Sequence, residues 1–214
     1  SEEQGFPSEL FLRRRAEAYQ AYFEHMPLRG VSRPTGPRMR LYRGFEYGDL
    51  AAFFVLDTRQ YRTDQPCGDR SGPTCAGVLD PQATLLGEEQ ERWLLSGLDR
   101  SATRWNVLPQ QVMMARVDRA PGSEERISMD QWSGYEAGRR RLMEFLAVRR
   151  PANPVVLTGD IHTNWVNDLQ VDYARDAESV VGTEFVGTSV TSGGDGSDVR
   201  DDTGSMLSEN PWVR

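Results

Sequence analysis

Hydrophobic positions fall into short apolar runs separated by longer segments with helical periodicity. Residues 50–56, 105–108 and 154–157 are short, mostly apolar runs, which is typical of buried strands, and the continuously apolar run 50–56 is typical of a strand covered on both faces. A weaker alternation over 41–47 predicts an edge strand, and 184–191 predicts a further strand. Together these patterns indicate a sheet built from several short strands.

Periodic segments over 10–26, 85–99 and 132–150 predict amphipathic helices between the strands. We expect Ser8 to cap the first helix, and Pro27 to end it. In the third helix, the run Arg139-Arg140-Arg141 is expected to face solvent. Alternating strands and helices predict an α/β fold, and no repeat or composition change divides residues 1–214 into separate domains.

Composition narrows the class of protein. The chain has 214 residues, of which 38% are hydrophobic and 27% charged, and no apolar run approaches the length of a membrane span. The net charge of −7 argues against a nucleic-acid-binding protein, which needs a basic face. These values predict a soluble globular domain with a full core.

Cys67 and Cys75 are separated by a loop rich in glycine and proline. Such a loop can close on itself in a disulfide, which would indicate an exported protein. The alternatives are two free thiols or half of a metal site, although no other cysteine exists to complete a cluster.

Asp160 and His162 follow the apolar run 154–157 and Gly159 directly. In an extended chain, residues two apart point to the same side, so both groups could converge just beyond the strand. A carboxylate beside an imidazole suits iron, manganese or zinc. The alternative is an Asp that caps a helix and a hydrogen-bonded loop histidine.

Two other predicted strands also end in polar residues. Asp57 and Arg59 follow the first apolar run, and Gln110 and Gln111 follow the second. If these strands are parallel neighbours, their ends share one edge of the sheet, where α/β proteins bind ligands. Arg59 could bind a phosphate or carboxylate, or pair with Asp57 or a neighbouring acid. Gln111 could reach a metal or substrate, or tie adjacent loops together. The loop 192–196 resembles a phosphate cradle only weakly, because it lacks the lysine and helix of a P-loop.

Several motifs in order along the chain resemble the alkaline phosphatase D (PhoD-like) family. The motifs are Phe11-Leu12-Arg13-Arg14-Arg15-Ala16, Leu56-Asp57-Thr58-Arg59-Gln60-Tyr61-Arg62, Trp105-Asn106-Val107-Leu108-Pro109-Gln110-Gln111, Asp130-Gln131-Trp132-Ser133-Gly134-Tyr135, Leu157-Thr158-Gly159-Asp160-Ile161-His162 and Thr183-Glu184-Phe185-Val186-Gly187-Thr188-Ser189-Val190-Thr191-Ser192. Because they span almost the whole chain, the resemblance is more specific than any one motif.

This resemblance implies a calcineurin-like metallophosphoesterase fold, a β-sandwich flanked by helices. It also implies an exported bacterial hydrolase of phosphate monoesters and diesters that uses calcium and iron. Asp160 and His162 match the last metal-binding motif of that superfamily, so they are implied as metal ligands and catalytic residues. Gln111 lies near the place of an earlier ligand.

The chain departs from the family pattern in one respect. Family members carry upstream Asp, Cys, Tyr and Asn ligands, including a Trp-Asp-Asp-His-Glu segment, which this sequence lacks. We therefore expect an incomplete sandwich that holds about half of the metal ligands. The rival expectation is a non-catalytic relic that keeps the fold without a complete metal site.

Overall fold

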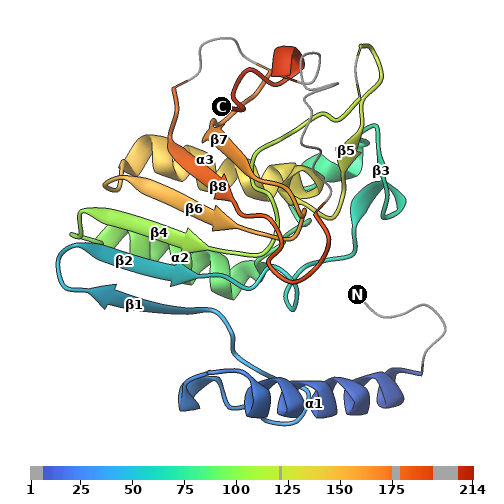
Figure 1. Cartoon of the computed structure of the whole chain (residues 1–214), viewed down its shortest axis with the longest axis vertical. Helices are drawn as coiled ribbons and strands as arrows, with labels where there is room; N and C mark the ends of the chain where they lie inside the picture. Colours follow the sequence, from blue (N-terminus) through green and yellow to red (C-terminus); the bar gives the residue numbers. More distant parts are fainter. Residues whose placement is uncertain (1–6, 121, 175–178, 195–206) are drawn as a thin grey trace. The chain divides into compact units, whose positions relative to one another are not determined.

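The computed structural model describes residues 7–120, 122–174, 179–194 and 207–214 (Figure 1). It has two compact units, residues 1–43 and 44–214. The first contains helix α1 (Ser8–His25) and a 3-10 turn, η1 (Gly30–Ser32). The prediction that Ser8 caps α1 was wrong: Ser8 is already helical, and Pro7 precedes it without a side-chain cap. Pro7 supplies the carbonyl that accepts the first helical hydrogen bond, from Phe11.

The second unit is built on a mixed sheet, and the α/β prediction is confirmed. Within the described residues this sheet has six strands in the order β1-β2-β4-β6-β8-β7. Strands β2 (Ala51–Val55), β4 (Trp105–Pro109), β6 (Pro154–Thr158) and β8 (Gly182–Val186) are parallel, and β7 (Trp165–Leu169) runs antiparallel to β8. Strand β1 (Arg43–Tyr47) lies beside β2. The central strands therefore end at one edge of the sheet.

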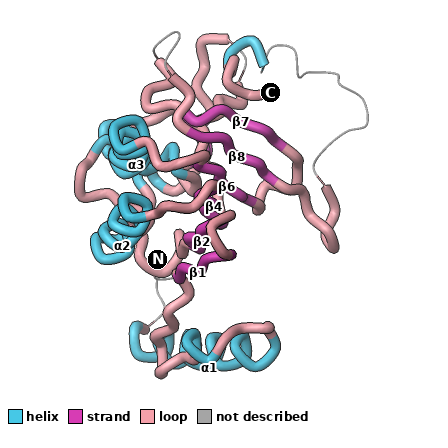
Figure 2. The backbone as a smooth tube through the Cα atoms, turned by 90° about the vertical axis from the view of Figure 1, so that its left-hand side faces the viewer, coloured by secondary structure: helices cyan, strands magenta, loops and turns pink. Residues whose placement is uncertain are grey.

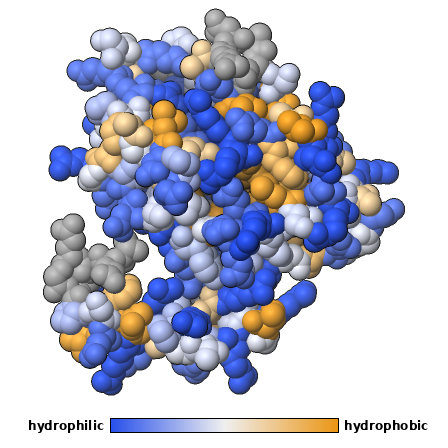
Figure 3. All heavy atoms as spheres, turned by 180° about the vertical axis from the view of Figure 1, so that it is seen from behind, coloured by the Kyte–Doolittle hydropathy of each residue, from blue (hydrophilic) through white to orange (hydrophobic). Residues whose placement is uncertain are grey.

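In the part of the chain that the structure describes, helices α2 (Gly87–Arg100) and α3 (Glu136–Arg149) both cover the same face of this sheet (Figure 2). On that face Leu108 and Val156 are completely buried. On the opposite face Leu157 is 40% exposed and Phe185 is 45% exposed. The prediction that 154–157 is a buried strand therefore holds for one face of β6, because its uninterrupted hydrophobic run covers one packed face and one open face. Viewed from behind, most of the surface is hydrophilic, and hydrophobic side chains gather right of its centre (Figure 3).

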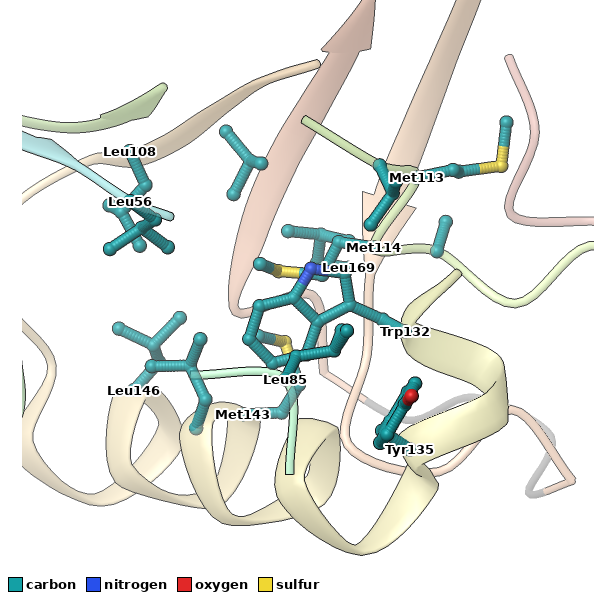
Figure 4. Packing of buried hydrophobic residues seen from close by; sticks show 14 of the residues in the cluster. Leu56, Leu85, Leu108, Met113, Met114, Trp132, Tyr135, Met143, Leu146 and Leu169 are labelled. Carbon is teal, nitrogen blue, oxygen red and sulfur yellow. The ribbon is translucent and has the colours of Figure 1, made fainter. Parts of the chain in front are cut away.

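The core between sheet and helices centres on Trp132 (Figure 4). Its indole lies among Leu85, Met114 and Leu169, all of which are nearly or fully buried. Helix α2 approaches the sheet closely at Gly97, where a Cβ atom would lie 2.5 Å from the Phe54 ring. A larger residue there would push the helix away from the sheet.

The third helical segment begins later than expected and is more buried. Residues Trp132–Tyr135 form a 3-10 turn, η4, before α3 starts. Arg139 was predicted to face solvent, which was wrong: its side chain is fully buried and pairs with Glu136 at 2.7 Å. Its other N–H groups donate to the carbonyls of Gln170 and Val171, so the guanidinium is satisfied inside the protein.

Two strand assignments also changed at the end of the chain. Strand β7 was not predicted, and the strand expected over 184–191 ends at Val186. Residues after Asn210 lie along β7: Arg214 N donates to Val166 O at 2.8 Å, and Asp168 N donates to Trp212 O at 2.9 Å. This segment occupies the outer edge of β7.

A smaller substructure holds the cysteine loop. Strands β3 (Ser71–Gly72) and β5 (Ile127–Ser128) pair antiparallel, flanked by the 3-10 turns η2 (Pro66–Gly68) and η3 (Ala76–Leu79). Cys67 and Cys75 form a disulfide with a Cα–Cα distance of 5.7 Å, as predicted. Among the described residues, every helix is too short or too polar to cross a bilayer.

Candidate functional site

Strands β2, β4 and β6 bring the three predicted polar segments to one edge of the sheet. The register pairs Ala52 with Asn106 and Val107 with Val155, so the strands end side by side. The Gln111 amide joins two of these ends. Its oxygen accepts hydrogen bonds from Thr58 N and Oγ1, both at 2.8 Å, and its nitrogen donates to Leu56 O at 2.9 Å. Gln111 thus ties the loop after β4 to the loop after β2.

The backbone that carries Arg59 is held by Asp57, a carboxylate that is only 3% exposed. Asp57 Oδ1 accepts hydrogen bonds from the backbone N–H groups of Arg59 and Gln60, each at 3.0 Å. The side-chain amide of Gln90 on α2 binds the backbone of Asp57 twice: its Oε1 accepts from Asp57 N at 2.8 Å, and its Nε2 donates to Asp57 O at 2.9 Å. The tight turn after β2 is consequently anchored to the core, and it aims Arg59 outward.

The Arg59 guanidinium lies between two carboxylates. Its Nη1 donates to Asp130 Oδ1 at 2.6 Å, and its Nη2 lies 3.6 Å from Asp160 Oδ1. Arg59 therefore pairs with neighbouring acids, the alternative raised from the sequence, although Asp57 binds its backbone and not its head group. Burial lowers the pKa of Arg59, but the hydrogen bond and charge of Asp130 outweigh burial and raise it.

The pKa of Asp130 shifts downward, in the opposite direction to that of Arg59. Burial favours its neutral form, but hydrogen bonds from Arg59 and Arg62 outweigh this effect and lower the pKa of Asp130. The carboxylate is therefore firmly ionised at neutral pH. Sequence reasoning did not single out Asp130 as a site residue, although it begins one of the motifs that carry the family resemblance.

Asp160 and His162 follow β6, but their backbone is not extended. Their φ angles are 77° and 55°, in the left-handed region, and Ile161 N donates to Gly159 O at 3.0 Å. The prediction that an extended segment directs both side chains to one side was therefore wrong, because Gly159 starts a tight turn. The turn is fastened to the loop after β8, where Thr188 Oγ1 donates to His162 O at 2.7 Å.

The donors at this turn fit part of a metal site. One carboxylate and one imidazole match the ligand preference of iron, whereas calcium takes six or more oxygens. Over the described ranges, no group of three or more His, Cys, Asp and Glu side chains is close enough to hold a metal ion. The two donors therefore suit a metal such as iron by type, but they are too few to fix its coordination geometry.

Behind the turn lies a buried polar network that sequence reasoning also missed. Glu184 in β8 is fully buried, and its oxygens accept hydrogen bonds from Thr158 Oγ1 at 2.7 Å and Asn167 Nδ2 at 3.0 Å. It also accepts from the backbone of Met114 and Ala115, at 2.7 and 2.9 Å. The network thereby holds Thr158, the last residue of β6, immediately before Gly159 in the chain.

Gln110 extends this network toward the core. Its amide nitrogen donates to Thr158 Oγ1 at 2.6 Å, and its oxygen accepts from the Trp132 indole at 3.1 Å. Both Gln110 and Gln111 therefore fasten strand ends to one another. In the loop 192–196, only Ser192, Gly193 and Gly194 belong to the described residues, so the weak cradle motif lies partly outside them.

Comparison with known proteins gives three concordant matches. A family model for PhoD-like phosphatase matches residues 1–214. The chain is 50% identical over 212 residues to alkaline phosphatase D of Bacillus subtilis (strain 168), covering 99% of this chain and 36% of that protein. A solved structure of PhoD matches with a TM-score of 0.92 and 49% identity, covering 100% of this chain and 41% of that one. The chain thus spans well under half the length of these relatives.

Proposed function

Because the chain belongs to the PhoD-like phosphatase family, we propose that it forms part of the catalytic domain of a metal-dependent hydrolase of phosphate monoesters and diesters. Residues 1–214 would all belong to that one domain. The observation that best supports this proposal is that Arg59 and Asp160, which are 101 positions apart in the chain, meet at the edge of the sheet where β2 and β6 end. A cationic side chain beside a candidate metal ligand suits a phosphoester, because the negative phosphoryl oxygens are stabilised both by the cation and by a bound metal ion.

In this proposal Asp160 and His162 hold the metal, and calcium and iron are the metals that the family implies. When bound, such ions polarise phosphoryl oxygens and lower the pKa of a coordinated water. The chain's own contribution is to present one oxygen and one nitrogen donor from a turn that Thr158, Glu184 and Thr188 hold in place.

Arg59 would bind a non-bridging oxygen of the substrate. Its planar guanidinium is suited to paired contacts with phosphate oxygens, and the turn at Asp57 holds it in advance. Gln111 would support this role by fixing Thr58 and the end of β2, and would offer its second amide N–H to the substrate. The partner we propose is a small phosphoester; the acidic chain favours no nucleic-acid partner beyond a phosphodiester substrate.

The remaining metal ligands would come from outside these 214 residues. An exported location, in the periplasm, cell wall or medium, agrees with the disulfide, which persists in oxidising compartments. The alternative function is a non-catalytic domain that keeps the fold, and the observation that favours it is the presence of only two metal donors at the turn among the described residues.

Replacing His162 tests the proposal in the native protein that contains this chain. His162→Ala should remove most phosphodiesterase activity and lower the bound metal content, while thermal unfolding stays cooperative. The matched control is His25→Ala, because His25 is the other histidine and lies exposed at the end of α1. Unchanged turnover and metal content in His162→Ala would remove His162 from the site. A wild-type protein that neither binds metal nor hydrolyses phosphoesters would support the non-catalytic alternative.

A further inference from the structure

Asp130 collects three donors on one oxygen. Its Oδ1 accepts hydrogen bonds from Arg59 Nη1, Arg62 Nη1 and Gln65 Nε2, each at 2.6 Å. All three donors come from the segment between β2 and the disulfide loop, whereas Asp130 lies between β5 and η4. A single carboxylate therefore links the Arg59 turn to a distant part of the chain.

This contact fixes the Arg59 guanidinium while leaving part of it open. The backbone of Arg59 is held by Asp57 and its Nη1 by Asp130, so both ends of the side chain are restrained. The Nη2 group lies 3.6 Å from Asp160 Oδ1, beyond normal hydrogen-bonding distance, and the Arg59 side chain remains 39% exposed. The guanidinium thus retains N–H groups for an acceptor that arrives beside Asp160.

A purely stabilising ion pair is a poor explanation for this arrangement. The side chains of Arg59 and Asp130 are 39% and 34% exposed, and ion pairs at such exposure contribute little to folding. The same carboxylate also binds Arg62, so two guanidinium cations share one anion. These three groups carry a net charge of +1, and the second carboxylate near Arg59, Asp160, lies at the longer distance of 3.6 Å, which leaves room for an incoming phosphate oxygen.

We propose that Asp130 is a positioning residue that holds the Arg59 guanidinium beside Asp160, where it can bind a phosphoryl oxygen of the substrate. This inference rests on the proposed function. Pre-organising Arg59 lowers the entropy lost on binding, because the long side chain is already fixed before the substrate arrives. Asp130 itself does not touch the substrate.

The test is a double-mutant cycle read out on inhibition by inorganic phosphate, which is the product of the proposed monoester hydrolysis. In the native protein we expect Asp130→Asn to raise the inhibition constant of phosphate about tenfold, and Arg59→Ala to raise it at least as much. In the Arg59→Ala background, Asp130→Asn should add less than about twofold, because the group that it positions is gone. The matched control is Asp99→Asn, which removes the acid of the Asp99–Arg149 pair on helices α2 and α3.

The outcomes separate this inference from the proposed function. If Asp130→Asn weakens phosphate binding equally with and without Arg59, or not at all, the positioning role is overturned while the hydrolase proposal stands. If Arg59→Ala leaves phosphate inhibition unchanged in an active enzyme, Arg59 is not a substrate group and the inference falls with it. Where Asp130→Asn does not fold, Asp130→Glu keeps the charge, displaces the guanidinium by one methylene, and enters the same cycle.

Discussion

The Thr158 hydroxyl donates a hydrogen bond to Glu184 Oε1 at 2.7 Å, and both residues are buried. Thr158 is the last residue of β6, two positions before Asp160, so this contact sets where the candidate metal-binding turn begins. Among the described residues Glu184 has no cationic partner within hydrogen-bonding distance; four neutral donors satisfy it instead. The position of the turn therefore depends on one uncompensated carboxyl group in the core.

We predict that Glu184→Gln destabilises the fold and changes its pH dependence. The amide nitrogen would face donors that now meet an oxygen, and each buried group left unsatisfied costs about 1–3 kcal/mol. Burial raises the pKa of Glu184 above 4.5, only partly offset by its hydrogen bonds. The folded state therefore binds this proton more tightly than the unfolded state, so the stabilising effect of Glu184 is full below pH 4.5 and declines as pH rises through the raised pKa.

Urea unfolding of both proteins at a series of pH values from 4 upward measures this effect. The difference in unfolding free energy between wild type and Glu184→Gln should narrow as pH rises. Glu46→Gln is the control, because Glu46 is an exposed residue of β1 and should show no such trend. A difference that widens with pH would mean that Glu184 is ionised more readily in the folded protein.

Glu184 also shows which parts of the fold the sequence could predict. The parallel strands β2, β4 and β6 were predicted because their hydrophobic residues, which form short apolar runs in the sequence, pack in the core. Strand β7 was missed because it contains Asn167 and Asp168, which are typical of turns. Asn167 is in fact completely buried, where it donates to Glu184. Polar residues that satisfy one another in the core cannot be recognised from hydropathy alone.

The candidate site was predicted in part for a similar reason. Parallel strands place their ends together, so the proximity of Arg59, Gln111 and Asp160 followed from topology. The directions of the side chains could not be predicted, because they depend on the backbone angles at Asp160 and His162, which residue spacing does not reveal. Asp130 was missed because it reaches Arg59 across 71 positions of the chain.

The disulfide between Cys67 and Cys75 should stabilise the cysteine loop. It closes a loop with a sequence separation of 8, for which chain entropy gives about 2.5 kcal/mol. We expect Cys67→Ala/Cys75→Ala and chemical reduction to lower the unfolding free energy by similar amounts. Thermal unfolding with and without reductant measures the loss. Peptide mapping that recovers both cysteines as alkylated thiols, without prior reduction, would contradict the pairing.

The buried Arg139 offers a prediction with a matched control on the same helix. Arg139→Met leaves two backbone carbonyls without their donor and leaves Glu136 with Arg140 as its remaining cation, and this loss inside the core should cost about 3 kcal/mol. Arg141→Met removes a half-exposed pair with Glu91, which should cost about 1 kcal/mol or less. Chemical unfolding of both variants decides the matter; equal losses would contradict the burial of Arg139.

The open face of the sheet predicts how the 214-residue chain behaves alone. Leu157 and Phe185 lie on the neighbouring strands β6 and β8, and Phe45 lies on β1. These residues are 40%, 45% and 41% exposed, and exposed apolar residues of this kind promote association. We expect the isolated chain to self-associate in sedimentation experiments and to show negligible phosphodiesterase activity. Leu157→Ser/Phe185→Ser should reduce association, whereas Val148→Ser, on helix α3, should not.

The activity of the isolated chain is checked with a chromogenic phosphodiester, with calcium and iron supplied. A site with two metal donors cannot fix a metal firmly enough for hydrolysis. Turnover within about tenfold of a full-length relative would show that the residues described here complete the site by themselves.

At Asp160 and His162 the backbone is left-handed, so the residue that would be most stable there is not the residue that could bind a metal. A residue with a Cβ atom pays about 1–2 kcal/mol to occupy that region, whereas glycine does so freely. A redesign guided only by thermal stability would therefore place glycine at both positions. It would delete the carboxylate and the imidazole together, so the most stable version of this turn is one that has nothing with which to bind a cation.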